Sequence, residues 1–169
     1  MIYYALLVVI TAERVAELVV SQRNAAASLR RGGVESGRGH FPVMVALHAA
    51  LLVGCWVEPA ALNRPFLPGL AWSMLALVVA ANALRWWCIN TLGPRWSARV
   101  IVLPGVPLVT AGPYRWFSHP NYVAVVVEGA ALPLVGSAWI TAGLFTVLNA
   151  ALLTVRLRCE TRALAAAAP

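Results

Sequence analysis

Long apolar segments alternate with short polar ones along the chain. Four segments are mostly apolar and close to the roughly 20 residues that a membrane-spanning helix needs: residues 2–20, 41–57, 69–87 and 138–155. A fifth, 123–134, carries Glu128 and barely reaches that length even when counted from His119. Pro133, Gly136 and Ser137 form an uncharged turn after it, so the last two segments are expected to pair as a helical hairpin. The pattern predicts about five transmembrane helices.

Composition supports a membrane protein over a soluble one. Of the 169 residues, 61% are hydrophobic and 11% are charged, whereas a soluble domain carries about 25% charged residues. Mean hydropathy is +0.77. We expect an all-α integral membrane fold and a single domain, 1–169, in which residues 1–88 supply three spans and residues 89–169 supply a loop region and the hairpin.

The arginines predict how the chain is oriented. They gather in the polar segments 21–40 and 88–122 and at the C-terminal end. Positive loops remain on the cytoplasmic side, so we expect the N-terminus and the turn 58–68 outside a bacterial cytoplasmic membrane and the C-terminus inside. The net charge of +7 is explained by this rule, and no basic helix interleaved with aromatic residues indicates nucleic-acid binding.

Some polar residues in the apolar segments could have either a structural or a functional role. Glu13, Arg14 and Glu17 interrupt the first apolar segment. They argue against a cleaved signal peptide, the competing interpretation raised by the small residues 25–27. Arg14 is expected to pair with one of the two glutamates near a helix end. The sequence assigns no role to these three charges or to His48. The cysteines, which are far apart, indicate neither disulfides nor a zinc site.

The segment 110–122 contains an unusual density of hydrogen-bonding and aromatic side chains. Its turns, Gly112-Pro113 and His119-Pro120, enclose hydrogen-bonding and aromatic side chains, although aromatic residues and arginine also gather at any membrane interface. Between it and the third span, residues 88–107 are read as a short interfacial helix followed by an extended segment. Arg156 and Glu160, four residues apart, share one helix face. The hairpin should bring that face back beside segment 110–122.

Such a convergence of titratable and aromatic groups is the default candidate for an active site. Phosphate loops, nucleophile elbows and zinc-protease motifs are missing from the sequence. The residues suit a cofactor with an aromatic base and a positive centre. An acid such as Glu160 would stabilise that centre, and Arg156 could hold an anionic acceptor with its two-pronged guanidinium.

The string from Gly112 to Tyr122, GPYRWFSHPNY, followed by Arg156-x-x-x-Glu160, resembles the isoprenylcysteine carboxyl methyltransferase family. The resemblance covers roughly residues 90–164. It implies an integral membrane enzyme that uses S-adenosylmethionine and forms S-adenosylhomocysteine, with a cytoplasmic cofactor pocket between the last two helices and the preceding loop. The N-terminal half looks like a bacterial subgroup, some members of which accompany polyketide synthases and methylate long-chain pyrones or resorcinols.

The resemblance also implies roles for individual residues. Arg156 would bind the acceptor and would form the catalytic pair with Glu160. Arg99 aligns less closely with a residue of the family that contacts the cofactor. The residues implied to bind the cofactor are Val106, Pro107, Leu108, Val109, Tyr114, His119, Pro120, Asn121, Tyr122 and Glu160. Two residues depart from the pattern of many members. Ser118 replaces an arginine, and Thr161 replaces a second glutamate. The absence of that second glutamate weakens the hypothesis that a pair of carboxylates acts as a base.

The expected function is O-methylation of a carboxylate or acidic hydroxyl on a lipophilic acceptor that enters from the bilayer. Two alternatives stay open. A phospholipid N-methyltransferase would need no anion clamp at Arg156, and a membrane scaffold or lipid-binding protein would bind no cofactor.

Overall fold

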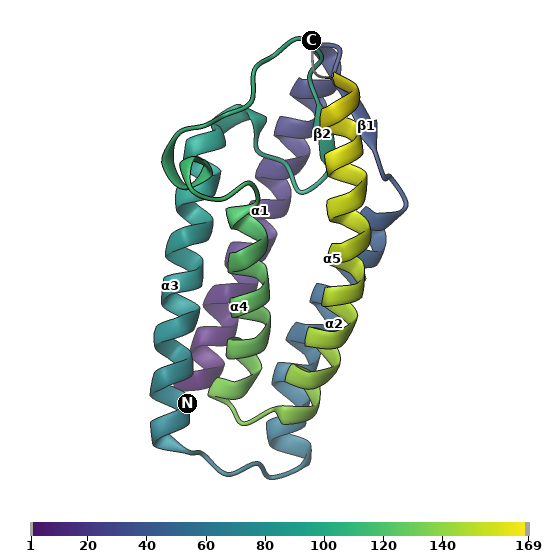
Figure 1. The fold of residues 1–169 in the computed structure, drawn as a ribbon. Coiled ribbons are helices and arrows are strands. Elements are labelled where there is room, and N and C mark those ends of the chain that lie inside the picture. Colours follow the sequence, from purple (N-terminus) through teal and green to yellow (C-terminus); the bar gives the residue numbers. More distant parts are fainter. Residues whose placement is uncertain (1, 168–169) are drawn as a thin grey trace.

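The structure is a computed structural model that describes residues 2–167. Five long helices run along a common axis (Figure 1): α1 (Ile2–Arg30), α2 (His40–Ala61), α3 (Pro68–Leu92), α4 (Pro120–Val135) and α5 (Trp139–Ala167). The remaining elements are short and gather at one end: β1 (Val34–Ser36), η1 (Gly93–Arg95), β2 (Val100–Val102) and η2 (Gly112–Arg115). The predicted all-α membrane fold is confirmed.

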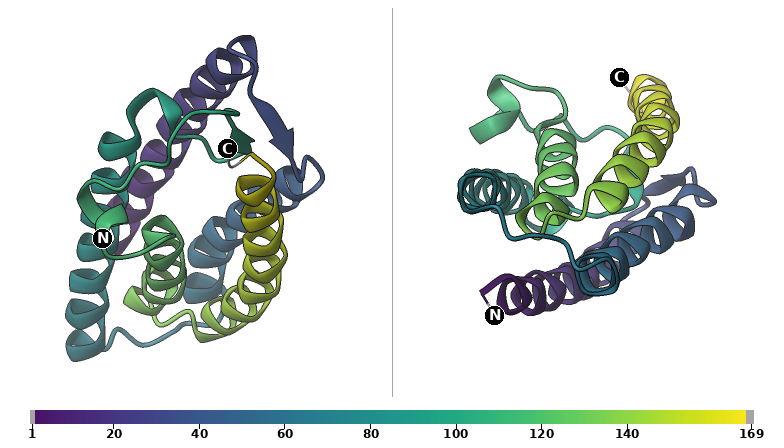
Figure 2. Two further views of the ribbon diagram at one scale, coloured as in Figure 1. Left: turned by 45° about the horizontal axis from the view of Figure 1, so that its top comes forward. Right: turned by 90° about the horizontal axis from the view of Figure 1, so that it is seen from below.

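The helices form two layers. Seen along the axis, α3, α4 and α5 lie side by side over α1 and α2 (Figure 2). The core between the layers contains Leu7, Ile10, Leu51, Cys55, Val78, Ala131, Leu132, Val135 and Phe145. A Cβ atom at Gly129 would lie 2.0 Å from the Phe145 ring, so this glycine allows α4 and α5 to approach closely.

The outer faces of the bundle are apolar. Large side chains such as Val53, Val79 and Val147 are 61%, 61% and 69% exposed, which is typical of surfaces that face lipid rather than water. Within the described residues, three helices are long and apolar enough to cross a membrane: His40–Ala61, Pro68–Arg95 and Trp139–Ala166. α4 is a shorter apolar helix, and α1 carries charges in its middle.

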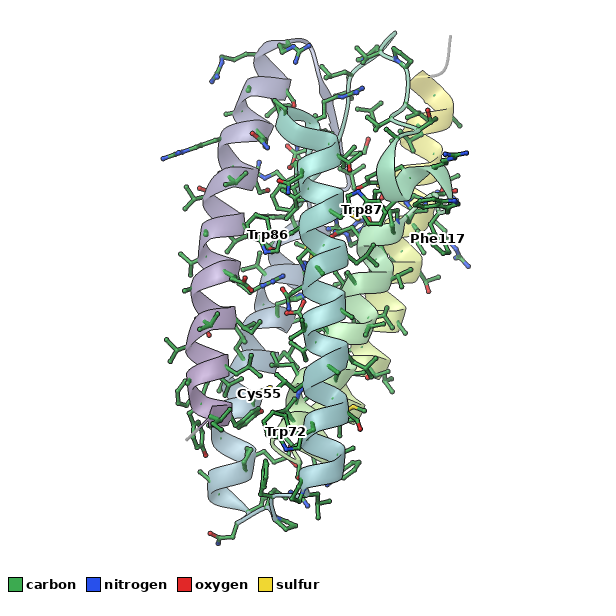
Figure 3. The ribbon with its side chains drawn as sticks, turned by 90° about the vertical axis from the view of Figure 1, so that its left-hand side faces the viewer. Cys55, Trp72, Trp86, Trp87 and Phe117 are labelled. Carbon is green, nitrogen blue, oxygen red and sulfur yellow. The ribbon has the colours of Figure 1, made fainter. Side chains whose placement is uncertain are left out.

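Aromatic side chains mark two levels along the axis. Trp86, Trp87 and Phe117 lie toward one end and Trp72 toward the other (Figure 3). Trp87 packs edge-on against Trp116, with ring centroids 5.8 Å apart. Tryptophans favour the membrane–water interface, so these levels fit the two boundaries of the hydrocarbon.

The two ends of the bundle differ in charge. The C-terminal end of α5, both strands and both 3-10 turns lie at one end, together with the arginines of segments 21–40 and 93–115. We call this the arginine-rich end. At the opposite end, Arg64 is paired with Glu58 at 2.8 Å. The Glu58 carboxylate also accepts the backbone N–H of Ile140 and Thr141, which caps the start of α5.

The prediction of a polar loop over residues 21–40 is wrong in its first half, because α1 continues to Arg30. Residues 25–27 are alanines, the best helix formers, and Gly32 at a φ of 84° ends the helical run. A two-stranded antiparallel sheet, in which Val34 pairs with Val102, was not predicted from the sequence. The 3-10 turn η1 and strand β2 otherwise agree with the expected helical turn and extended segment.

Candidate active site between the hairpin and the aromatic loop

Helices α4 and α5 form the predicted hairpin, and it brings Glu160 beside the start of α4. The Tyr122 hydroxyl donates a hydrogen bond of 2.6 Å to Oε2 of Glu160. The other oxygen, Oε1, lies 3.6 Å from Nδ1 of His119. Two side chains from one end of the hairpin therefore hold one carboxylate from the other end.

Arg156 lies one turn before Glu160 on α5 and is only 5% exposed. Its Nη2 donates a hydrogen bond of 2.8 Å to the carbonyl oxygen of Ala98. The guanidinium carbon lies 6.0 Å from the centre of the Tyr122 ring, within the range of a cation–π contact. Nε of Arg156 is buried and has no hydrogen-bond partner among the described residues. The Arg156 guanidinium is thus held through Nη2, while its Nε has no partner within the described part of the chain.

Residues 110–122, which we call the aromatic loop, contribute a pair of stacked rings and a neutral phenol. The rings of His119 and Tyr122 lie 5.5 Å apart with an angle of 17° between their planes. The neighbouring Glu160 carboxylate raises the pKa of His119 above its usual range. Burial is the main reason why the pKa of Tyr114 is raised, so this phenol remains protonated at neutral pH.

Local geometry fixes where the loop lies. Gly112 has a φ of 55°, and a Cβ there would lie 2.5 Å from the Thr91 hydroxyl of α3. A glycine is needed for both reasons. Pro120, fully buried, occupies the first turn of α4, where a missing N–H costs nothing. The Asn121 carbonyl oxygen Oδ1 is buried, with no hydrogen-bond partner in the described part of the chain.

The structure brings some of the predicted residues together and leaves others apart. His119, Tyr122, Arg156 and Glu160 form one cluster through the contacts above. The segment Val106–Val109 is irregular and largely exposed, with Leu108 at 66%, and Arg95 donates to the Pro107 carbonyl. Its assignment to the cofactor stays a prediction. Arg99 contacts Glu35 and Phe41 instead of this cluster.

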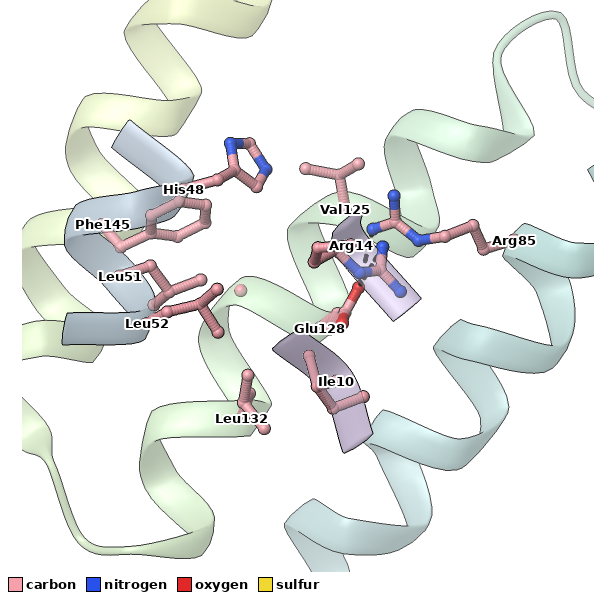
Figure 4. Close-up of a pocket in the computed structure, with 11 residues that line it drawn as sticks. Ile10, Arg14, His48, Leu51, Leu52, Arg85, Val125, Glu128, Leu132 and Phe145 are labelled. Carbon is pink, nitrogen blue, oxygen red and sulfur yellow. Dashed lines mark hydrogen bonds and ion pairs between the residues drawn. The ribbon is translucent and has the colours of Figure 1, made fainter. Parts of the chain in front are cut away.

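A second charged cluster lies inside the bundle and was only partly foreseen (Figure 4). Arg85 donates a hydrogen bond of 2.6 Å to Glu128, and Arg14 donates one of 3.0 Å to Glu17. Arg14 also lies 3.6 Å from Glu128, so α1, α3 and α4 are joined. Pairing of Arg14 was predicted, but it occurs in the middle of α1 rather than near a helix end.

The charges border a cavity of about 20 Å³ that also contacts His48. Nδ1 of His48 lies 2.8 Å from the Met44 carbonyl oxygen, and the ring packs edge-on against Phe145. These contacts give His48 a structural role. The missed signal was that Arg85 and Glu128 are each isolated charges in an apolar segment, and such charges tend to pair inside a bundle.

Comparisons with known proteins identify the family. The model of the isoprenylcysteine carboxyl methyltransferase (ICMT) family matches residues 74–166. The chain belongs to this family. ICMT membership places it among integral membrane methyltransferases, and the matched residues include the whole cluster around Glu160.

Two relatives extend the similarity over the N-terminal half. The uncharacterized protein YpbQ of Bacillus subtilis is 33% identical over 163 residues, which are 96% of this chain and 96% of that protein. An uncharacterized protein of Haemophilus influenzae is 24% identical over 156 residues, 92% of this chain and 90% of its own length. The sequence similarity to these proteins therefore extends into the N-terminal half, outside the ICMT match.

Proposed function

We propose that the protein is an S-adenosylmethionine-dependent O-methyltransferase that acts on a carboxylate or acidic hydroxyl of a lipophilic acceptor. The observation that carries the proposal is the joining of Glu160 to Tyr122 and His119 beside the buried Arg156. A carboxylate and a guanidinium one helical turn apart offer separate contacts for a positive donor and a negative acceptor.

The residues of the cluster fit the cofactor. Glu160 would face its positively charged groups, and Asn121 has a buried carbonyl oxygen free to accept a hydrogen bond. Tyr114, Tyr122 and His119 supply aromatic surface for the adenine ring. When bound, S-adenosylmethionine supplies an electrophilic methyl group, and the C–S bond that breaks leaves neutral S-adenosylhomocysteine.

Arg156 is assigned to the acceptor. Its buried guanidinium would hold an anionic oxygen and orient it for attack, and positioning of this kind supplies much of the rate of a group transfer. A carboxylate acceptor is already ionised, so this residue need only bind it. For an enol or phenol, the nearby positive charge would lower the acceptor pKa, and the released proton would leave to water.

The acceptor is proposed to reach Arg156 from the bilayer and the cofactor from the cytoplasm. The arginine-rich end, which contains the cluster, is the end that the positive-inside rule places in the cytoplasm. We also propose that biosynthetic enzymes of the polyketide type act alongside this protein, and this proposal rests only on the resemblance to the bacterial subgroup.

The alternatives predict different behaviour of Arg156. A phospholipid N-methyltransferase transfers the methyl group to an amine and needs no anion clamp at the reacting atom, and a scaffold would bind no cofactor. The buried position of Arg156 one turn from Glu160 favours an anionic acceptor over both.

The test separates cofactor binding from transfer. Purified protein is incubated with methyl-labelled S-adenosylmethionine and a lipid extract, and cofactor affinity is measured by calorimetry. Arg156→Ala should lower transfer by about 10² or more, as the loss of a preorganised charged donor does, and leave cofactor affinity nearly unchanged. Glu160→Ala should weaken cofactor binding by roughly 1–3 kcal/mol.

Arg158→Ala is the matched control, since Arg158 is an exposed arginine of the same helix. It should retain both properties. Parallel loss of affinity and transfer in Arg156→Ala would show that Arg156 and Glu160 share one ligand. Wild-type protein without cofactor binding in detergent or nanodiscs would favour the scaffold.

A further inference from the structure

A second pocket lies at the arginine-rich end, between the start of α2 and the strands. It is open, has a volume of about 430 Å³ and is lined by Glu35, Arg38, Phe41, Pro42 and Arg99. The volume falls within the roughly 300–1,000 Å³ of small-molecule sites. Except for Arg99, these residues lie outside the family match of 74–166, so the pocket is not a feature of the shared ICMT region.

The charges around the pocket do not cancel. The Glu35 side chain is only 7% exposed, and it lies 3.2 Å from Nε of Arg38 and 3.6 Å from Nη1 of Arg99. Two arginines thus share one carboxylate, which leaves a single positive charge. The Arg99 guanidinium carbon also lies 5.0 Å from the centre of the Phe41 ring, within the range of a cation–π contact.

Both arginines keep donors for a ligand. Nε of Arg99 is buried with no hydrogen-bond partner in the part of the chain that the structure describes, and buried donors in proteins are normally satisfied. The Arg38 side chain is 77% exposed and can turn toward a bound group. Planar guanidinium groups recognise phosphate with paired hydrogen bonds. The first turn of α2, at Phe41 and Pro42, adds the positive end of a helix dipole.

The depth of the pocket matches lipid headgroups. Helix α2 has 22 residues, a length of about 33 Å at 1.5 Å per residue, compared with about 30 Å for the hydrocarbon of a bilayer. Its first turn therefore lies near the boundary between hydrocarbon and headgroups. A single excess positive charge at that level complements a phosphodiester, which carries one negative charge.

We propose that this pocket binds the phosphate group of an anionic phospholipid. Glu35 is already occupied by two arginines, so it offers no contact to the ammonium group of a zwitterionic lipid. A lipid held by Arg99 would also steady the neighbouring Ala98, whose carbonyl oxygen anchors Arg156 at 2.8 Å. The bound lipid would thereby support the candidate active site from the side of α2.

The experiment measures lipid binding directly. The full chain, purified in detergent, is titrated with dioleoyl phosphatidylglycerol or dioleoyl phosphatidylcholine, and the lipid-bound fraction is followed by native mass spectrometry. Phosphatidylglycerol should bind at least tenfold more tightly. Arg99→Gln and Arg38→Gln should each weaken its binding by about tenfold or more, as expected for loss of a charge-assisted hydrogen bond. If Arg99→Gln does not fold, the exposed Arg38 supplies the test.

Arg31→Gln is the matched control, because it removes an exposed arginine of the same end. It should change affinity by no more than about fivefold, the change that corresponds to a general surface attraction of about 1 kcal/mol per arginine near an anionic membrane. Equal losses in all three variants, or equal affinity for the two lipids, would overturn the proposal. Inorganic phosphate should displace phosphatidylglycerol only at far higher concentration. Displacement at equal concentration would identify free phosphate as the ligand and overturn the lipid assignment.

Discussion

Glu160 is the residue on which the candidate site depends, because both Tyr122 and His119 contact its carboxylate. The spacing of Arg156 and Glu160 and the hairpin before them were enough to predict this meeting from the sequence. The direction in which Arg99 and Val106–Val109 face was not predictable. These residues lie in irregular segments, where the path of the backbone depends on distant contacts such as that between Arg95 and Pro107.

A prediction at this scale concerns the pair of His119 and Glu160. The pKa of His119 is raised in the folded state by Glu160, so the protonated histidine stabilises the fold. That stabilisation is complete below the unfolded pKa of about 6.5 and is lost as pH rises through the higher folded value. Both side chains are partly exposed, at 25% and 27%, so the effect should be on the order of 1 kcal/mol or less.

The measurement is thermal unfolding in detergent between acidic and mildly alkaline pH. Wild-type protein should be more stable than His119→Gln at low pH, and the difference should vanish as pH rises. His40→Gln is the control, since Nδ1 of His40 has no hydrogen-bond partner in the described residues. A difference that grows with pH would contradict the proposed ion pair.

At the scale of elements, helix α1 is stabilised by charges rather than by apolar composition alone. Arg14 and Glu17 meet Arg85 of α3 and Glu128 of α4. The length of the apolar segment 2–20 indicated the helix, and the alanines after residue 24 explain its extension to Arg30. The sequence could not predict that these ion pairs join three helices, because the partner of an isolated charge depends on which helix faces pack together.

Removing one member of this cluster should destabilise the bundle strongly. Glu128→Gln leaves Arg85 without the carboxylate that it contacts at 2.6 Å, and breaking a buried ion pair costs about 3–5 kcal/mol. The double variant Glu128→Leu with Arg85→Met should recover most of the loss, because neither charge then lies unpaired in the bundle.

Reversible unfolding in mixed micelles measures these variants, and the single variants Glu128→Leu and Arg85→Met complete a double-mutant cycle that isolates the interaction. Glu13→Gln is the control. Glu13 lies 3.7 Å from Arg14 and is 29% exposed, so its loss should cost much less. Equal costs for Glu13→Gln and Glu128→Gln would contradict a special role for the buried pair.

At the scale of the whole molecule, the ends of the bundle differ in charge and in architecture. The arginine-rich end carries the β1–β2 sheet, the 3-10 turns and the Glu160 cluster, and the opposite end carries short connections. The asymmetry of charge was predictable from the sequence. The sheet was not, because its strands are only three residues long and pair across distant segments.

The last prediction is that the arginine-rich end faces the cytoplasm. The positive-inside rule requires this orientation, and the only arginine in the loop between α2 and α3, Arg64, is paired with Glu58.

Single cysteines are placed at each end after Cys55, Cys88 and Cys159 have been replaced. Gly39→Cys suits the arginine-rich end because a Cβ there meets nothing within 4 Å, whereas one at Gly33 would lie 2.8 Å from the Ser28 carbonyl oxygen. Ala61→Cys suits the opposite end, where residue 61 is exposed. A membrane-impermeant maleimide should label Ala61→Cys in intact cells and Gly39→Cys only after lysis. The reverse pattern would place the Glu160 cluster outside the cell, away from cytoplasmic S-adenosylmethionine, and would overturn the proposed route of the cofactor.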